Sequence, residues 1–253
     1  MAVLFVISLV LATSLAQIPI PQREVGFVYD SANPNAPVHF DFYIDQMCPY
    51  SKEAFGTVLL LASVYGPEKM KLTIHLFPLP YHRNSFYASK GSHIFSNVTD
   101  AATTFSWMQT IYDRMDLFSN NATINMPDSQ IVDMFASVAD KVGVPASQFK
   151  ALIMDENIEM DTRVGWKYCC TRGVAHTPTF MINDVTVAGE PTWTVSEWKQ
   201  VIDPLLSGPP LVRPLKATNT TCPPGIKQCE FLPGKIECCK DGEFCIPNVG
   251  CRC

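Results

Sequence analysis

The chain has 253 residues, an apolar content of 47% and a formal net charge of −5. Its 19 Lys and Arg residues are scattered along the sequence, which excludes the clustered basic footprint of a nucleic-acid-binding protein. The apolar content suffices for one sizeable core. No stretch after residue 16 approaches the roughly 20 apolar residues of a membrane-spanning helix.

Residues 1–16 are typical of a cleaved signal peptide. About a dozen apolar residues end in Ser14-Leu15-Ala16, which places small side chains where a signal peptidase reads them. The segment starts without Lys or Arg, and the alternative is a buried N-terminal strand or helix. We expect a secreted, extracellular protein that passes through or resides in the endoplasmic reticulum, although the terminal Cys251-Arg-Cys253 is no retention signal.

The cysteine content also indicates an oxidising compartment. Three of the ten cysteines are Cys48, Cys169 and Cys170. The other seven lie in the last 32 residues: Cys222, Cys229, Cys238, Cys239, Cys245, Cys251 and Cys253. Three Asn-x-Thr acceptors predict N-glycosylation at Asn97, Asn121 and Asn219.

The first predicted elements are a strand, a helix and a second strand. Residues 38–44 carry apolar side chains at every second position, which predicts a strand. A helix is expected from Pro49 to about residue 62, because proline suits the first turn. The second strand covers residues 71–77, and this order favours a parallel pair with a right-handed crossover.

A helical block and a second strand pair complete this domain. Apolar residues recur at spacings of three and four through about residues 84–171, which predicts an all-helical insertion. Strands return at residues 179–182 and 185–187, and a last helix begins at the capping box Thr194-Val-Ser-Glu197. The expected fold class is therefore α/β, in a domain of residues 25–206.

Two further parts are expected after this domain. Residues 207–221 are rich in proline and polar side chains, which is typical of an extended linker. Residues 222–253 are too few to bury a stabilising core, so we expect disulfides to hold a small C-terminal module together. A zinc site is the disfavoured alternative, because the compartment is oxidising and the segment contains no histidine.

Cys48 is the strongest candidate for chemistry in the chain. At the start of a helix, unpaired N–H groups and the positive end of the dipole stabilise a thiolate, which is the form that attacks disulfides. Cys48-Pro-Tyr-Ser51 after a buried strand resembles the active-site turn of the thioredoxin superfamily. The segment Gly173–Asn183 resembles that family's cis-proline segment, and Phe77–His82 before a helical block resembles its DsbA-like branch.

The resemblance implies a thioredoxin-like fold and roles for particular residues. Cys48, Ser51 and Pro178 would be the catalytic group, with Pro178 in a cis peptide bond that faces Cys48. The backbone of Thr177 would receive substrate by strand-like pairing, and Tyr50 would lie in the same substrate-binding region.

Three ionisable side chains lie near this turn in the sequence or by the resemblance. His82 and His176 could each stabilise a thiolate or relay a proton. The favoured interpretation of His82 is an exposed loop histidine, whereas His176 is equally well interpreted as a substrate-binding residue near Cys48 or as an exposed loop histidine. Asp45, three residues before Cys48, would oppose thiolate formation if it lay close.

Ser51 is a departure from the Cys-x-x-Cys motif of the family's oxidoreductases. Its hydroxyl can donate a hydrogen bond to the Cys48 thiolate but cannot form a disulfide, which excludes a self-contained dithiol oxidase cycle at this motif. A monothiol that uses glutathione or another external thiol, a trap for clients and a retired site all remain open. Cys169 or Cys170 could act as a resolving partner, but we favour a structural disulfide between them or with the tail.

The cysteine spacing of the tail resembles inhibitor-cystine-knot, or knottin, modules. In these the first cysteine pairs with the fourth, the second with the fifth and the third with the sixth. The resemblance implies the bonds Cys222–Cys239, Cys229–Cys245 and Cys238–Cys251 or Cys238–Cys253. Six cysteines allow 15 pairings, so this pattern is a hypothesis, and the seventh cysteine departs from it.

The function implied is secreted thiol–disulfide exchange with protein or glutathione thiols through Cys48. As an enzyme, the protein would be a monothiol thiol–disulfide oxidoreductase or isomerase. The alternative is a non-catalytic secreted binding protein that uses the fold and the tail to recognise an extracellular protein. Kappa-class glutathione transferases share the inserted fold, but Cys48 and the export signal count against that class. We expect no metal and no cofactor, apart from glutathione as a thiol co-substrate.

Overall fold

The computed structural model describes residues 20–21, 24–207, 222, 227–232, 235–239, 244–246 and 250–252. The chain divides into two compact units between Leu206 and Ser207, and each is described by itself. The predicted signal peptide, nearly all of the predicted linker, Asn219 and Cys253 lie outside the described residues. Among the helices that are described, none is long and apolar enough to cross a membrane.

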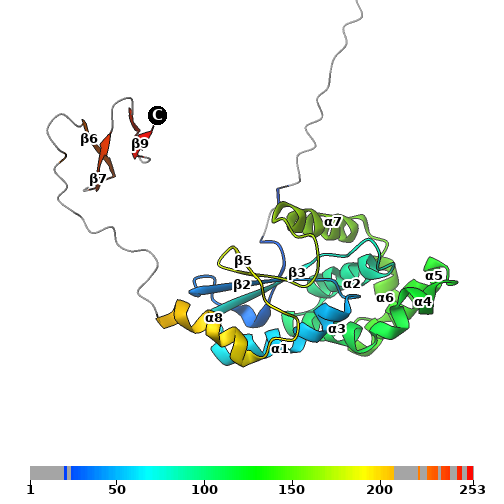
Figure 1. Ribbon diagram of the computed structural model, residues 1–253. Coiled ribbons are helices and arrows are strands. Elements are labelled where there is room, and N and C mark those ends of the chain that lie inside the picture. The colour runs from blue at the N-terminus through cyan, green and yellow to red at the C-terminus, as the bar shows by residue number, and fades with distance from the viewer. Residues whose placement is uncertain are drawn as a thin grey trace, which may run out of the picture. The chain divides into compact units, whose positions relative to one another are not determined.

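A five-stranded sheet forms the centre of the larger unit (Figure 1), in the order β1-β3-β2-β4-β5. The strands are β1 (Phe27–Val28), β2 (Val38–Ile44), β3 (Met70–Leu76), β4 (Thr179–Ile182) and β5 (Val185–Val187). Strands β2 and β3 pair in parallel and the other neighbours are antiparallel. The parallel pair requires a crossover, which α1 (Pro49–Tyr65) supplies.

Helices cover both faces of this sheet (Figure 1). On one face, Phe40 of β2 packs edge-on against Trp198 of α8 (Val195–Ser207), with the ring centroids 5.0 Å apart. On the other face, His75 of β3 stacks on Tyr168 of α7 (Glu156–Thr171) at 5.3 Å. Successive side chains of a strand point to opposite faces, so the alternating apolar residues of 38–44 all lie on the face that α8 covers.

The chain between β3 and β4 is helical. Its elements are α2 (Ser85–Val98), α3 (Ala101–Asp113), the 3-10 turn η2 (Met115–Phe118), α4 (Asn120–Thr123), α5 (Asp128–Val142), α6 (Ala146–Leu152) and α7. A second 3-10 turn, η1 (Tyr29–Ser31), follows β1. The predicted α/β fold with an all-helical insertion is therefore confirmed.

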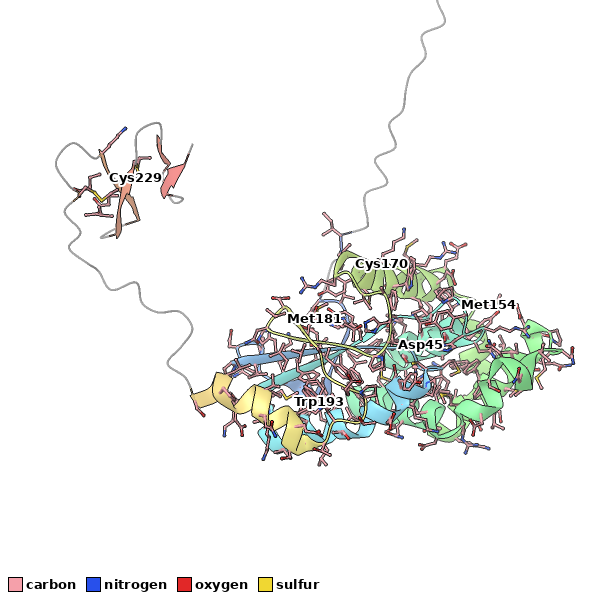
Figure 2. All side chains as sticks on the ribbon, in the orientation of Figure 1. Asp45, Met154, Cys170, Met181, Trp193 and Cys229 are labelled. Atoms are coloured by element: carbon pink, nitrogen blue, oxygen red, sulfur yellow. A yellow bond between two sulfur atoms is a disulfide. The ribbon has the colours of Figure 1, made fainter. Side chains whose placement is uncertain are left out.

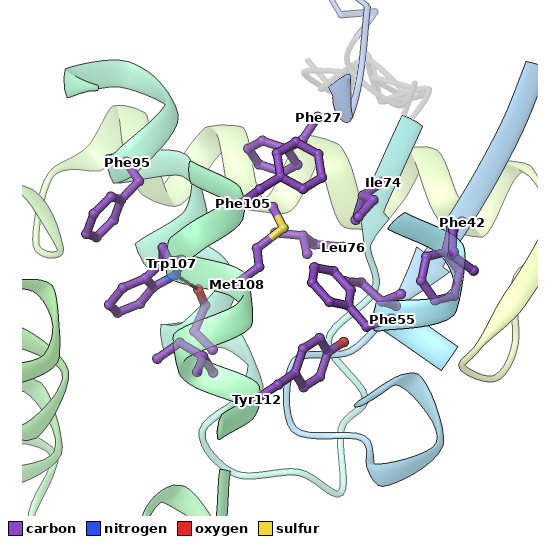
Figure 3. Close-up of a cluster of buried hydrophobic side chains, with 14 of the residues drawn as sticks. Phe27, Phe42, Phe55, Ile74, Leu76, Phe95, Phe105, Trp107, Met108 and Tyr112 are labelled. Carbon is purple, nitrogen blue, oxygen red and sulfur yellow. Dashed lines mark hydrogen bonds between the residues drawn. The ribbon is translucent and has the colours of Figure 1, made fainter. Parts of the chain in front are cut away.

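Helix α3 joins the insertion to the main core (Figure 3). Trp107 stacks on Phe95 of α2 at 4.8 Å, and its Nε1 donates a hydrogen bond to the carbonyl of Ala88. A Cβ added to Gly91 would overlap the Trp107 ring. The glycine in α2 is therefore what lets the two helices approach.

The smaller unit contains two antiparallel hairpins. They pair β6 (Lys227–Leu232) with β7 (Lys235–Cys239), and β8 (Phe244–Ile246) with β9 (Gly250–Arg252). Disulfides join Cys222 to Cys238 and Cys229 to Cys245, and Cys239 is also disulfide-bonded. The predicted disulfide-rich character of the tail is confirmed.

The implied pairing of the tail is correct at one bond and wrong at another. The Cys229–Cys245 bond is present, but Cys222 pairs with Cys238 instead of Cys239. Because adjacent residues of β7 point to opposite faces, the fold decides which of the two neighbours Cys222 can reach. Cys238 is thereby occupied, so its implied bond to Cys251 or Cys253 is wrong as well.

Alanine substitutions at two helical glycines test the α2–α3 contact. Gly91→Ala should lower the free energy of unfolding by about 1–3 kcal/mol, because the Trp107 ring must move to admit a methyl group. Gly56→Ala in α1 is the matched control, since an added Cβ meets nothing within 4 Å. It should be neutral or stabilise by up to about 1 kcal/mol. Urea unfolding followed by tryptophan fluorescence measures both, and equal stabilities would contradict the contact.

Candidate active site

Cys48 is the residue that caps the N-terminus of α1. Its backbone is extended, with φ −89° and ψ 121°, and Pro49 occupies the start of the helix, as the sequence predicts. The amide of Lys52 donates to the Cys48 carbonyl at 3.0 Å, which begins the helical ladder. The thiol therefore lies at the positive end of the α1 dipole, beside N–H groups that have no partner within the helix.

The loop before β4 faces this thiol. The Thr177–Pro178 peptide bond is cis, as the resemblance implies. The Sγ of Cys48 donates a hydrogen bond to the carbonyl oxygen of Thr177 at 3.4 Å, which joins segments 129 residues apart. Both residues are nearly buried, with 4% of Cys48 and 7% of Thr177 exposed. Two of the three implied catalytic residues, Cys48 and Pro178, are therefore brought together.

Tyr50 and His176 lie at the surface on the two segments that meet at Cys48. Tyr50, in the first turn of α1, is 61% exposed. His176, in the loop, is exposed and its carbonyl accepts a hydrogen bond from Thr179 Oγ1 at 2.7 Å. The described contacts of these two side chains include none with Cys48.

Ser51, Asp45 and Tyr112 form a ring of polar groups, and its hydrogen bonds do not include Cys48. The amide of Asp45 donates to Ser51 Oγ at 3.4 Å, and the hydroxyl of Tyr112 donates to the Asp45 carbonyl at 3.2 Å. Burial raises the pKa of Tyr112 well above its usual value, so this hydroxyl stays protonated. The ring fixes the turn to a helix of the insertion.

The carboxylate of Asp45 is fully buried and accepts four hydrogen bonds. Oδ1 accepts from the amide of Met47 at 2.8 Å and from Ser85 Oγ at 2.5 Å. Oδ2 accepts from the amide of Leu79 at 3.1 Å and pairs with Nδ1 of His82 at 2.6 Å. Asp45, labelled in Figure 2, thereby ties three separate segments together.

Sequence reasoning missed this pair. The interpretation of His82 as an exposed loop histidine is wrong, because its side chain is only 21% exposed and is bound to Asp45. The signal available was a histidine soon after the predicted second strand. The carboxyl ends of parallel neighbours meet at one edge of a sheet, which brings the loop after β3 against the loop after β2.

Cys169 and Cys170 are both free thiols, so the favoured structural disulfide is wrong. They are consecutive residues of α7, where side chains point about 100° apart. Cys169 is buried and its Sγ donates to the carbonyl of Leu76 at 3.6 Å, whereas Cys170 is exposed (Figure 2). Burial raises the pKa of Cys169 strongly, and partial desolvation raises that of Cys170.

The site contains no arrangement of side chains suited to a metal ion. Among the described residues, no three His, Cys, Asp or Glu side chains come together in a group that could hold one.

Comparison with known proteins identifies the family. The sequence profile described as thioredoxin matches residues 32–204, a range that includes both Cys48 and Pro178. The chain belongs to the thioredoxin family. No curated protein sequence matches it significantly.

Solved structures of DsbA-like proteins share the fold. Oxidised BdbD from Bacillus subtilis is 15% identical, with a TM-score of 0.56 over 72% of this chain and 94% of its own. The thiol-disulfide exchange protein α-DsbA2 from Wolbachia pipientis is 18% identical, with a TM-score of 0.55 over 71% and 87%. DsbA2 from Pseudomonas aeruginosa is 16% identical, with a TM-score of 0.56 over 76% and 100%. The thioredoxin-like fold expected from the sequence is thereby confirmed.

Removal of one hydroxyl tests the ring around Ser51. Tyr112→Phe should lower the free energy of unfolding by about 1 kcal/mol, because the buried hydrogen bond from the Tyr112 hydroxyl is lost while the Asp45 carbonyl keeps its bond from the Cys48 amide. Tyr81→Phe is the control, since this ring is 62% exposed and should leave the urea midpoint unchanged. Equal midpoints for Tyr112→Phe and the unmodified chain would contradict the ring.

The two thiols of α7 should differ in reactivity. At pH 7 iodoacetamide should modify Cys170 slowly and leave Cys169 untouched, because the thiolate is the reactive form and Cys169 is also shielded from solvent. Modification of Cys170 should accelerate up to at least pH 9. Timed labelling followed by peptide mass spectrometry measures both sites. Equal rates in the native protein would show that the packing around Cys169 is wrong.

Proposed function

We propose that this protein is a secreted thiol–disulfide exchange protein that acts through the single nucleophilic thiol of Cys48. The observation that carries the proposal is the contact of Cys48 Sγ with the Thr177 carbonyl beside the cis Pro178. A thiol at the start of a helix is stabilised as a thiolate, and the facing loop offers backbone groups to an extended client.

The exchange proceeds by two attacks that balance in sulfur and electrons. The Cys48 thiolate attacks one sulfur of a client disulfide, that S–S bond breaks, and the client's other sulfur leaves as a thiolate. The result is a mixed disulfide between Cys48 and the client. An external thiolate, from glutathione or from a client cysteine, then attacks the mixed disulfide and releases Cys48. Ser51 cannot perform this second attack.

The remaining residues position the client. Thr177 would pair with it through the backbone, and Pro178 shapes the loop that faces the thiol. Tyr50 and His176 present exposed rings on the two segments that meet at Cys48. In this proposal Ser51 acts on the turn through Asp45, because its hydroxyl already accepts a hydrogen bond from the Asp45 amide.

The proposed localisation and domain organisation follow from the sequence. A signal peptide at residues 1–16 would direct export, and the side chains of Asn97 and Asn121 are exposed as acceptors of N-glycans require. The thioredoxin domain of residues 25–206 would be joined by the linker at 207–221 to a knottin-like module at 222–253. That module is the candidate surface for an extracellular protein partner.

The burial of Cys48 favours a second candidate function. With 4% of the residue exposed, a bulky disulfide reaches the thiol only if the facing loop moves. A non-catalytic binding protein that keeps the fold and uses the tail for recognition would show this burial. The reactivity of Cys48 decides between the two.

Oxidised glutathione is the probe that tests the proposal. The mature protein should form a glutathione mixed disulfide at Cys48, and Cys48→Ala should abolish it, because no other thiol lies at a helix start facing the Pro178 loop in the described part of the chain. Cys170→Ala is the matched control and should leave the adduct unchanged. Intact-mass and peptide mass spectrometry measure the adduct. A Cys48 that reacts as slowly as Cys170 would favour the binding protein.

Ser51→Cys tests the monothiol mechanism in the same assay. The thiol introduced at position 51 should attack the adduct, form a disulfide with Cys48 and release reduced glutathione. The unmodified protein should keep its adduct until an external thiol is added. Spontaneous release of glutathione from the unmodified protein would show that another cysteine of the chain resolves the mixed disulfide.

A further inference from the structure

We propose that His82 is a positioning residue for Cys48: its protonated ring neutralises the buried Asp45 carboxylate, which would otherwise oppose the Cys48 thiolate. The inference rests on the proposed exchange function and concerns the control of that same site by pH. In this proposal neither residue contacts the client. Their effect on the reaction passes entirely through the charge beside Cys48.

Asp45 and Cys48 share one tight turn. The amide of Cys48 donates to the carbonyl of Asp45 at 3.0 Å. The Tyr112 hydroxyl bonds to the same carbonyl, and negative charge on Asp45 and on Cys48 both raise the pKa of that hydroxyl. Asp45 and Cys48 therefore both influence the buried hydroxyl of Tyr112. In this buried turn, water does little to screen their charges from each other.

His82 is placed to control the charge of this turn. Its Nδ1 lies 2.6 Å from Asp45 Oδ2, and its side chain is 21% exposed whereas that of Asp45 is fully buried. The ring can therefore exchange its proton with water while the carboxylate cannot reach water directly. A histidine changes charge near neutral pH more readily than any other unperturbed side chain.

The other groups packed around the pair do not carry the compensating charge. Asp45 is also bonded to two backbone amides and to the hydroxyl of Ser85, all of them neutral. Arg83, the neighbour of His82, is turned away and pairs with Asp128. The ring of Tyr81 meets the His82 ring edge-on at 4.9 Å. Among the described partners of Asp45, His82 is thus the one that can be positively charged.

The sign of the effect follows from these contacts. When His82 is protonated, the pair has no net charge and leaves the Cys48 thiolate unopposed. When His82 is neutral, the negative charge of Asp45 has only neutral donors as partners, and it disfavours a second negative charge at Cys48. The pair therefore favours thiolate at mildly acidic pH, so exchange at Cys48 would continue there.

His82→Asn is the variant that separates charge from hydrogen bonding. An asparagine amide can replace Nδ1 as the donor to Asp45, but it is never charged. The full mature protein is labelled with iodoacetamide from pH 5 to 9, and the Cys48 and Cys170 peptides are quantified separately. At pH 6 the labelling rate of Cys48 should fall about tenfold in His82→Asn. A change of about one pH unit alters the thiolate fraction of a thiol by the same factor. The Cys170 rate should not change, and labelling is carried out below the thermal unfolding midpoint of each variant.

Two further variants complete the test. In an Asp45→Asn background, His82→Asn should have no effect on the Cys48 rate, because the negative charge is already absent. His82→Lys, which keeps a positive charge, should retain rapid labelling at pH 6, and it decides the matter if Asp45→Asn fails to fold. Superimposed pH profiles for His82→Asn and the unmodified protein would overturn the inference. The inference would also be overturned if His82→Asn slowed Cys48 labelling equally in the Asp45→Asn background. It would be overturned likewise if His82→Lys slowed labelling as much as His82→Asn does.

The same data separate this inference from the proposed function. If Cys48 of the unmodified protein reacts as slowly as Cys170 at every pH, the exchange function fails and the inference fails with it. If Cys48 reacts rapidly but ignores His82, the exchange function stands and only the role of His82 is rejected.

Discussion

The structure of the site depends on the buried carboxylate of Asp45. An ionised carboxylate removed from water costs several kcal/mol unless hydrogen bonds replace the lost hydration. Four donors do so here, and they come from the turn before α1, the loop after β3 and the start of α2. Because none of these segments can withdraw without leaving the charge unpaired, the carboxylate holds the turn of Cys48 against the helical insertion.

This anchoring explains how a serine fits where the Cys-x-x-Cys motif has its second cysteine. Ser51 is fully buried, and a buried hydroxyl needs partners. It finds one in the Asp45 amide, so it supports the turn instead of completing a redox pair. The thiol of Cys48 instead bonds to the Thr177 carbonyl of the opposite loop. The residue that supports the turn and the residue proposed to react are thus different.

Short-range patterns in the sequence predicted the elements that short-range interactions determine. The alternation in residues 38–44 indicated β2, and Pro49 marked the start of α1. The roles of Asp45 and His82 could not be read in the same way, because their contact joins residues 37 positions apart and depends on how two loops meet. The pairing of Cys222 with Cys238 depends on which face of β7 it reaches, and cysteine spacing holds no such information.

The geometry of α7 bears on how a mixed disulfide at Cys48 would be resolved. Its two cysteines are adjacent in sequence, yet the helix directs one into the core and the other to solvent. Cys169 is shielded and its pKa is strongly raised, so it supplies little of the thiolate that an attack requires. Cys170 is exposed but its pKa is also raised. With Ser51 in the position of the usual resolving thiol, neither cysteine of α7 is well suited to the second attack.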